Sequence, residues 1–514
     1  MPLPQRISIA AALAALISLP LTAQTSSSPS SAAPKVGPAH GTVIVVGGGA
    51  MGPEIYSRFI AAAGGPDALI VDVPTAGGDS VYSQDAPGTR GWKAAGAKHV
   101  VVLHTTDRKL ANTDSFAAVL KQAGGVWFEG GRQFHLVDSY AGTKTEDGFH
   151  DVLARGGVVG GSSAGASILG DFLVRGAPSN NNMIMDSPGY EKGFAFLRGV
   201  GIDQHVVARE RLADLADSIM PKYPTLLGMS EDEGTAWVVQ GDTATIIGRD
   251  KAFVYGGKDA TDPGKPFLTL HPGDRYDLGA RRVLHRAASE SPVSADLVGS
   301  LIKKHVKSGA QATVLVAENG KVFVDTSFGV PAQAKYMPTT TVPQFALGHL
   351  ADPLEALCAK LPPPPAGRGG AAGRGRGNAP PMTAFQTCVT RQIGGTVGWH
   401  KTTADADNSM HSDVDELYRL ALWYESLAAL RNASAVSETA VQAAAAPEIN
   451  AGWQRDAVNG EARYAAYGVE GGKRDAFVRL PDRRASVIIL TDDDTADVKA
   501  IADAITAKLA AAPR

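Results

Sequence analysis

Cysteine is scarce in this chain of 514 residues, where only Cys358 and Cys388 occur. The pair brackets a low-complexity insertion, residues 361–381, that contains the runs PPPP and GRGRG. In an oxidising compartment the two could bridge, and closing a loop of about 30 residues would stabilise the fold by roughly 3–4 kcal/mol. Two buried thiols are the alternative. We favour the disulfide because a bond across a low-complexity insertion has a clear structural use.

Positive charge is not in surplus either, since the formal net charge is -3. A protein that binds the nucleic-acid polyanion would show a basic surplus, so we expect no nucleic-acid partner. The hydrophobic content of 44% and the charged content of 20% are ordinary for a globular protein. Because single cores stop growing near roughly 250–300 residues, the length predicts two domains.

The apolar run near the N-terminus, Ile7 to Leu21, falls short of the roughly 20 residues that a membrane-spanning helix needs. It follows Arg6 and leads into Leu21-Thr22-Ala23, which is the layout of a secretory signal peptide. We expect cleavage after Ala23 and a secreted or periplasmic protein with no membrane span; an uncleaved anchor is the alternative. Residues 24–40 are rich in Ser, Ala and Pro and are predicted to form a disordered linker.

Buried strands alternate with helical patterns in the first half of the chain. This alternation predicts an α/β fold with a mostly parallel sheet and helices on both faces. A second cluster of shorter, hairpin-like strands follows. The expected strands are Thr42 to Val46, Ala68 to Val73, His99 to His104, Val126 to Glu129 and Val158 to Gly161, then Leu226 to Met229, Ala236 to Val239, Ala244 to Gly248 and Ala252 to Tyr255. A helical pattern covers Asp114 to Ala123.

The character of the sequence changes after Arg286, where strands at both ends enclose helices. This predicts a separate α+β domain over residues 285–514, with a hairpin turn at Asn319-Gly320. Expected helices are Ser294 to Ser308, Val414 to Ala429 and Thr495 to Ala510; expected strands are Ala312 to Glu318, Lys321 to Thr326, Ala476 to Leu480 and Ala485 to Thr491.

Gly47, Gly49 and Gly52 form a G-x-G-x-x-G pattern after the first strand, which invites a dinucleotide-binding interpretation with Asp72 as the confirming acid. Any tight turn between strand and helix also uses glycines. We give cofactor binding little weight and expect neither a cofactor nor a metal.

A stronger signal is Gly161-Ser162-Ser163-Ala164-Gly165, which fits G-x-S-x-G and follows an apolar strand. Strand, tight turn and helix are the context that this nucleophile elbow requires. Ser163 is then the candidate nucleophile, and the amide of Ala164 can donate to a developing oxyanion. A Gly/Ser turn at a strand end is the alternative. A serine also needs a base, and spacing alone does not select His205 from the other histidines.

Four motifs in order resemble the cyanophycinase and aspartyl-dipeptidase family of serine peptidases over about residues 41–284. They are Phe128-Glu129-Gly130-Gly131-Arg132-Gln133, Gly161 to Ser167, Asp203-Gln204-His205 with Arg209 and Arg211, and Asp232-Glu233-Gly234-Thr235-Ala236. The resemblance implies a sandwich like that of class I glutamine amidotransferases, with Ser163 as nucleophile, His205 as base and Glu233 as the orienting acid.

The same resemblance assigns the surroundings of the triad. The second oxyanion donor would come from Gly130-Gly131. The residues implied to line the substrate pocket are Gln133, Asp203, Gln204 and Arg211, joined by Arg209 and Arg132. Arginines there would hold substrate carboxylates through paired hydrogen bonds; a solvated helix face is the alternative for Arg209 and Arg211.

Two departures from the family pattern affect specificity. Arg132 stands where the family usually has Asp or Asn, and Asp214 replaces a third arginine expected three residues after Arg211. These exchanges redistribute charge across the pocket. Aspartyl or isoaspartyl peptide hydrolysis is therefore a safer expectation than strict specificity for cyanophycin, the β-aspartyl-arginine polymer.

From about Ala295 the chain resembles the serine β-lactamase and penicillin-binding-protein-like family. The segments that carry this resemblance are Asn319-Gly320-Lys321-Val322, Gly394 to Thr403, Met410 to Leu417 and Leu480 to Thr491. That family needs S-x-x-K, but His349 and Asp352 occupy the serine and lysine positions. We expect this domain to be inactive in β-lactam chemistry.

The leading hypothesis is an exported serine peptidase that acts on peptides containing aspartyl residues, with an inactive C-terminal module. Homo-oligomerisation stays open. The alternatives are a binding protein whose catalytic site has lapsed, and an esterase-type acyl hydrolase that uses the same serine.

Overall fold

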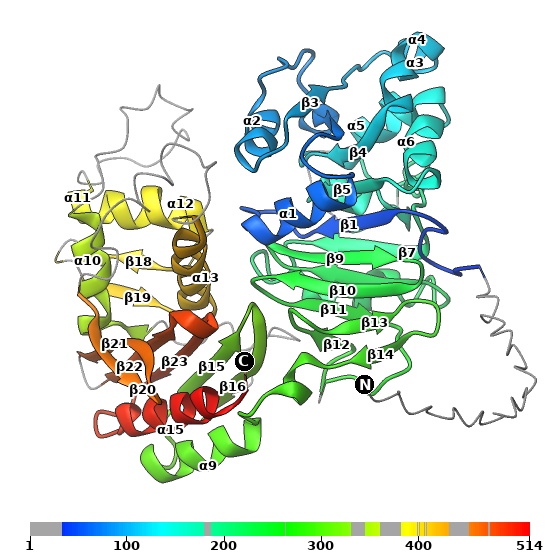
Figure 1. Cartoon of the computed structure of the whole chain (residues 1–514). Helices are drawn as coiled ribbons and strands as arrows, with labels where there is room; N and C mark the ends of the chain where they lie inside the picture. Colours follow the sequence, from blue (N-terminus) through cyan, green and yellow to red (C-terminus); the bar gives the residue numbers. More distant parts are fainter. Residues whose placement is uncertain are drawn as a thin grey trace, which may run out of the picture. The chain divides into compact units, whose positions relative to one another are not determined.

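The computed structural model describes residues 33–178, 184, 187–262, 264–329, 345–359, 382–397, 399, 401–405, 407, 409–430, 452–470 and 473–513 (Figure 1). The expected signal peptide, residues 24–32 of the expected linker and the low-complexity insertion lie outside these ranges. Contacts join Pro34–Arg514 into one unit. We describe residues 34–286 as the N-terminal part and residues 287–513 as the C-terminal part.

The N-terminal part is built on a nine-stranded sheet in the order β14-β13-β10-β9-β1-β5-β4-β2-β3. The five strands from β1 to β3 in this order are parallel, as predicted, whereas β9, β10, β13 and β14 continue the sheet antiparallel. The sheet is therefore mixed. Its strands are β1 (Thr42–Val46), β2 (Leu69–Val73), β3 (His99–Val102), β4 (Ala123–Phe128), β5 (Val158–Ser162), β9 (Thr235–Gln240), β10 (Thr243–Gly248), β13 (Arg275–Asp277) and β14 (Arg282–His285).

A second sheet of five strands has the order β12-β11-β8-β7-β6. Its strands are β6 (Gly170–Phe172), β7 (Leu197–Gln204), β8 (Leu227–Glu231), β11 (Ala252–Tyr255) and β12 (Phe267–Leu270). The helices of this part are α1 (Pro53–Ala62), α2 (Pro87–Ala94), α3 (Arg108–Ala111), α4 (Asp114–Ala117), α5 (Gln133–Tyr140), α6 (Lys144–Ala154), α7 (Ala164–Ser167) and α8 (Leu212–Asp214). Short turns lie at η1 (Pro74–Gly77), η2 (Ala118–Lys121) and η3 (Leu215–Ile219).

Alternation along β1 shows how the layers pack, because successive side chains of a strand point to opposite faces. Val43 and Val45 belong to a core that includes residues of α5, α6 and the second sheet. Ile44 and Val46 belong to a different core with Phe59 of α1 and Trp92 of α2. All five β1 residues are buried. Both faces of the parallel strands are thus covered, which explains their continuous apolar sequences.

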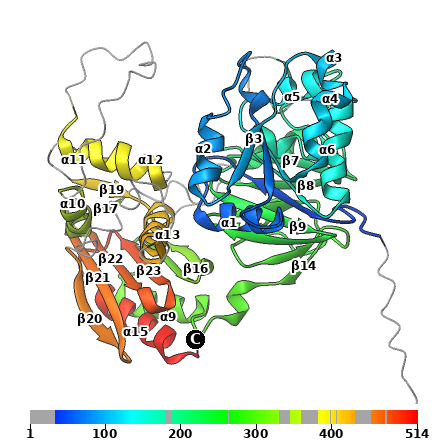
Figure 2. The ribbon, with the colours of Figure 1, turned by 45° about the horizontal axis from the view of Figure 1, so that its top comes forward.

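The C-terminal part has its own antiparallel sheet in the order β16-β15-β23-β22-β21-β20. Figures 1 and 2 show α9 and α15 together on one face, with α13 on the other. The strands are β15 (Ala312–Glu318), β16 (Lys321–Phe328), β20 (Gln454–Val458), β21 (Glu461–Glu470), β22 (Lys473–Leu480) and β23 (Ala485–Thr491), and a small sheet holds β17 (Phe345–Ala346), β18 (Thr403–Ala404) and β19 (Met410–Ser412).

The helices of the C-terminal part are α9 (Ala295–His305), α10 (Asp352–Cys358), α11 (Ala384–Thr387), α12 (Gly394–Val397), α13 (Val414–Leu430) and α15 (Val498–Ala511), with turns η4 (Ala287–Glu290), η5 (Gly348–Ala351), η6 (Cys388–Ile393) and η7 (Pro481–Arg483). None of its hydrophobic clusters shares a residue with those of the N-terminal part among the described residues. We therefore propose two domains that meet near His285.

Several expected elements differ from the structure. The helix expected over Asp114 to Ala123 is instead α4 followed by the turn η2, and β4 already begins at Ala123. The linker expected over 24–40 is wrong for its last residues. The backbone amides of Lys35, Val36 and Gly37 donate hydrogen bonds to the Asp242 carboxylate at 2.8, 2.8 and 3.0 Å, which a Ser/Ala/Pro-rich composition does not reveal.

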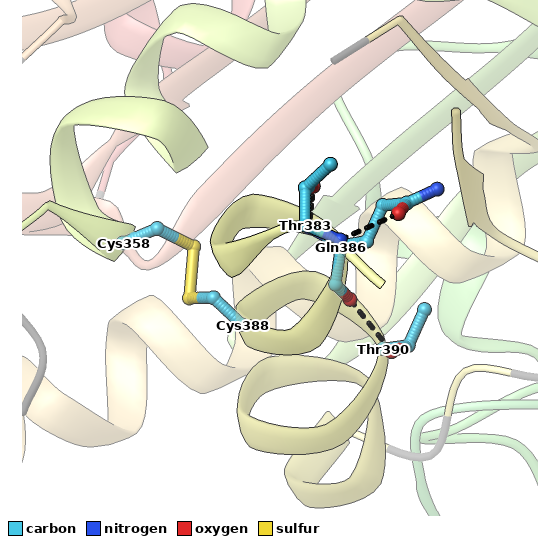
Figure 3. Close-up of a disulfide and its surroundings, with 5 residues drawn as sticks. All are labelled: Cys358, Thr383, Gln386, Cys388 and Thr390. Carbon is cyan, nitrogen blue, oxygen red and sulfur yellow. Dashed lines mark hydrogen bonds between the residues drawn. A yellow bond between two sulfur atoms is a disulfide. The ribbon is translucent and has the colours of Figure 1, made fainter. Parts of the chain in front are cut away.

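Cys358, at the end of α10, is joined to Cys388, at the start of η6, by a disulfide (Figure 3). The adjacent α11 begins with a capping box, in which the side chains of Thr383 and Gln386 each accept a hydrogen bond from the other's backbone amide. The disulfide therefore links two short helical elements on either side of the insertion.

No helix within the described ranges is both long and apolar enough to span a membrane.

We predict that Cys358→Ser and Cys388→Ser each lower the free energy of unfolding by about 3–4 kcal/mol, because either change reopens the same loop. The double variant should lose no more than either single variant, since all three lack the same bond. Denaturant unfolding measures this. A double variant as stable as the wild type would contradict the disulfide.

Candidate active site

Ser163 lies in the sharp turn between β5 and α7, with φ 57° and ψ -118°. Such a positive φ is uncommon for a residue other than glycine. The turn is possible because glycines stand on both sides of it, where a side chain would clash. A Cβ on Gly161 would lie 2.1 Å from Gly165 O, and one on Gly165 would lie 2.0 Å from Phe128 O. The Ser163 amide donates to Val46 O at 3.0 Å, which ties the turn to the end of β1.

Three side chains distant in sequence form one hydrogen-bonded chain. His205 Nε2 lies 2.8 Å from Ser163 Oγ, and His205 Nδ1 lies 2.5 Å from Glu233 Oε1. A carboxylate accepts from Nδ1–H, so Nε2 is left to accept the serine proton. His205 follows β7 and Glu233 lies between β8 and β9. This is the order in which a nucleophile, its base and an orienting acid are arranged.

The glycines after β1 lie directly against the hydrogen-bonded side chains of His205 and Glu233. A Cβ on Gly48, where φ is +99°, would lie 2.0 Å from His205 Cε1, and one on Gly49 would lie 2.5 Å from Glu233 Oε2. The carbonyl of Gly47 accepts the His205 amide at 3.0 Å, and that of Gly48 accepts the Gly234 amide at 2.8 Å. The glycine run therefore lets the imidazole and the carboxylate approach the backbone closely.

Asp72, the acid that a dinucleotide site would need, is fully buried. Burial and the negative charge of Glu129 raise the pKa of Asp72 to about 8, while Thr89 donates a hydrogen bond to it. The Asp72 carboxyl, on β2, is therefore part of the packed interior.

The charge state of His205 is set mainly by its surroundings. Burial lowers the pKa of His205 below its ordinary value, the hydrogen bond to Glu233 opposes this, and the positive charges of Arg209 and Arg211 lower it further. A lowered pKa keeps the imidazole neutral at neutral pH, which is the form that can accept a proton.

Two backbone segments lie beside the serine. Ala164 is the first residue of α7, so its amide has no acceptor within that helix. On the other side a Cβ on Gly130 would lie 3.3 Å from the Ser163 Cβ, so the Gly130-Gly131 turn runs directly beside the serine. Gly131 has φ +146°, and a Cβ there would lie 2.1 Å from Ala76 O, which excludes larger residues.

The two glutamines predicted for the pocket meet at Ser167 of α7. Gln133 Nε2 and Gln204 Nε2 both lie 3.4 Å from Ser167 Oγ. Gln204 Oε1 is buried and accepts no hydrogen bond from the part of the chain that the structure describes. An oxygen in this condition is suited to receive a donor from a bound molecule.

The predicted pocket acid Asp203 is already paired. Arg175 Nε and Nη2 donate to its two carboxylate oxygens at 2.8 Å each, and Nη2 also donates to Asp214 Oδ2 at 2.5 Å. Arg175 is only 4% exposed and has φ 60°. Sequence reasoning missed this arginine, because no motif places it beside residues 28 and 39 positions further along the chain.

The remaining predicted arginines differ in environment. Arg211 is buried, and this burial together with the charge of Arg175 lowers its pKa to about 10. The solvated-helix alternative is therefore wrong for Arg211, which lies directly before α8. Arg209 is exposed. Arg132 is half-buried, and its guanidinium donates to Ala177 O at 3.3 Å.

Comparison with known proteins gives the class. A family model described as peptidase family S51 matches residues 43–247. A cyanophycinase of Synechococcus elongatus is 30% identical over 271 residues, which cover 48% of this chain and 82% of the relative. A cyanophycinase of Geminocystis herdmanii is 29% identical over 255 residues, covering 46% and 93%. A solved peptidase from an acI-B1 Actinobacterium is 22% identical, with a TM-score of 0.36, covering 46% and 97%.

The protein is thus a serine-type peptidase. The chain belongs to peptidase family S51. The resemblance drawn from the four ordered motifs is confirmed for this half of the chain.

We predict that Gly48→Ala slows reaction of Ser163 with a fluorophosphonate by about 100-fold or more, because the new methyl group must displace the imidazole. Gly65→Ala is the matched control. Gly65 has φ +100°, but a methyl group added there would meet nothing within 4 Å, so this variant tests backbone strain alone. Equal rates in the two variants would contradict a close-approach role for Gly48.

Proposed function

We propose that this chain hydrolyses aspartyl or β-aspartyl peptide bonds, with Ser163 as nucleophile, His205 as general base and Glu233 as the acid that orients the imidazole. The observation that carries the proposal is the continuous hydrogen-bonded chain from Ser163 Oγ through His205 to Glu233. The relatives named cyanophycinase support the substrate class.

In the first half of the reaction Ser163 Oγ attacks the carbonyl carbon while His205 Nε2 takes the hydroxyl proton. The amides of Ala164 and of the Gly130-Gly131 turn stabilise the negative oxygen of the tetrahedral intermediate. Glu233 stabilises the charged imidazolium without taking its proton. The imidazolium then protonates the leaving amine, the C–N bond breaks, and an acyl-enzyme remains on Ser163.

In the second half a water molecule gives its proton to His205 Nε2 and attacks the acyl carbon. Collapse of the second tetrahedral intermediate returns the proton to Ser163 Oγ and releases the carboxylic acid. The same imidazole thus acts as base and acid in both halves, for which a pKa not far from the working pH is suited.

Arg211 and Arg209 are proposed to attract the substrate's free carboxylate, and Gln204 Oε1 to accept one of its N–H groups. Asp214 is not an isolated negative charge here, because Arg175 pairs with it while also pairing with Asp203. The Asp214 departure therefore places a carboxylate paired with Arg175 where the family has an arginine, and we propose that this favours small aspartyl peptides over strict recognition of one polymer.

We further propose that the chain is exported and that its C-terminal part is a β-lactamase-like domain without that activity. Ser412, in the segment Met410 to Leu417 that carries part of this resemblance, is fully buried, and its Oγ lies 2.7 Å from Thr402 Oγ1. The side chain of His349 lies outside the described residues. A buried hydroxyl that is already hydrogen-bonded is a poor group for contacting a ligand.

The central prediction is that Ser163→Ala lowers kcat/KM for β-Asp-Arg or another aspartyl dipeptide by about 10⁴-fold or more, since the covalent route is lost. Release of the free amino acid measures this across a panel of β-aspartyl, α-aspartyl and simple ester substrates.

Ester turnover alone would favour the esterase alternative. No turnover and no fluorophosphonate labelling by folded wild-type protein would favour the binding-protein alternative. β-Lactam turnover that survives Ser163→Ala would contradict the inactive C-terminal domain.

The pH dependence follows from the lowered pKa of His205. The base must be neutral, so the labelling rate of Ser163 should fall on the acid side with a midpoint below the ordinary histidine value of 6.5. Removing a positive charge favours the imidazolium, so Arg209→Gln should move this midpoint to higher pH. Arg90→Gln, at an exposed arginine paired with Asp85, is the control and should leave the midpoint in place. A midpoint that moves to lower pH in Arg209→Gln would overturn this electrostatic assignment.

A further inference from the structure

Asp232 connects the two loops that carry the base and the acid. Its carboxylate Oδ1 accepts hydrogen bonds from the amides of Val207 at 3.1 Å and Ala208 at 2.9 Å. These amides belong to the turn directly after His205, and Asp232 itself directly precedes Glu233. Asp232 is only 1% exposed. A shift of this one carboxylate would therefore move both partners of the imidazole hydrogen bond.

The other oxygen of Asp232 faces a cation from the C-terminal part. Arg419 of α13 places Nη2 2.6 Å from Asp250 Oδ2 and 3.5 Å from Asp232 Oδ2. Asp250 is held in turn, because its amide donates to Thr235 Oγ1 at 2.8 Å. Arg419 is 5% exposed, so the three charges meet away from water.

A second cation makes the reverse connection next to the first. Lys251 of the N-terminal part places Nζ 2.6 Å from Asp325 Oδ2 of β16 and 3.2 Å from Asp415 Oδ1 of α13. Each part thus inserts one cation between two carboxylates of the other. We call these six residues the clasp: Asp232, Asp250, Lys251, Asp325, Asp415 and Arg419.

Buried ion pairs lose so much hydration that they add little to stability, and their better attested use is to fix one arrangement of the chain. What the clasp fixes at its Asp232 end is the geometry of the loops that carry His205 and Glu233. Of the two clasp cations, Arg419 reaches Asp232. The charge of Arg419 therefore acts on the carboxylate that holds these loops.

We propose that Arg419 is a positioning residue for the peptidase site, acting through Asp232 to hold His205 and Glu233 in line with Ser163. This rests on the proposed function of that site. The C-terminal part then serves catalysis through a structural contact, although we expect it to have no β-lactam chemistry of its own. The helix that carries Arg419 begins within Met410 to Leu417, one of the segments that resemble the β-lactamase family.

The test compares Arg419→Gln with Arg483→Gln in the full chain. Arg483 is the matched control, since it is also a buried arginine between two carboxylates, Glu461 and Glu318, but both of these lie in the C-terminal part. Arg419→Gln should slow fluorophosphonate labelling of Ser163 and lower kcat by about 10-fold or more, with KM changed by less than about 3-fold. Arg483→Gln should keep the labelling rate and kcat of the wild type.

Hydrogen exchange gives a readout that does not need activity. Peptides that span 205–209 should exchange faster in Arg419→Gln than in wild type or Arg483→Gln, because Asp232 then holds the Val207 and Ala208 amides less firmly. Arg419→Lys keeps the charge and should restore part of both the protection and the labelling rate; it also serves if Arg419→Gln does not fold. The pH midpoint of labelling should shift in Arg419→Gln and stay in Arg483→Gln.

Unchanged exchange over 205–209, or wild-type labelling by folded Arg419→Gln, would overturn the positioning role. Equal loss of labelling in the Arg483→Gln control would overturn it too, because the effect would then be general destabilisation. Failure of the proposed function is recognised separately: wild-type protein would not be labelled at Ser163, whereas the exchange comparison would still report on the clasp.

Discussion

The site depends on one constraint. His205 and Glu233 must approach closely the backbone of the glycines that follow β1. The carbonyls of Gly47 and Gly48 accept amides from both loops, and the absence of side chains there leaves room for the imidazole and the carboxylate. The Ser163 amide bonds to the residue just before this run. One strand end therefore sets the relative positions of all three groups, which come from three different strand connections.

The acidic side chains around this strand end pair with arginines from distant parts of the sequence. Arg175 is shared by Asp203 and Asp214 on one side of the site, and Arg419 is shared by Asp232 and Asp250 on another. Both arginines are buried, so their fields are weakly screened. The pocket arginines proposed for substrate, Arg209 and Arg211, are thereby left as the cations whose charge acts on His205.

Local pattern was enough to predict much of the N-terminal fold and to single out Ser163. Apolar β-branched runs give the parallel strands, and G-x-S-x-G after such a run gives the elbow. His205 and Glu233 could be chosen only through ordered family motifs, because nothing in spacing marks which histidine meets the serine. Arg175 and Arg419 could not be predicted, since buried ion pairs depend on tertiary proximity. The glycine run was visible but ambiguous, because close approach to a side chain and to a phosphate require the same missing Cβ.

The most direct test of the proposed chemistry is to trap the covalent intermediate. Protein mixed briefly with a β-aspartyl dipeptide and quenched in acid would be digested and mapped by mass spectrometry. We expect an aspartyl acyl group on the peptide that contains Ser163, absent when the serine is replaced by alanine. Turnover of the dipeptide with no adduct under any quench time, or with the acyl group on another residue, would contradict the role of Ser163 as nucleophile.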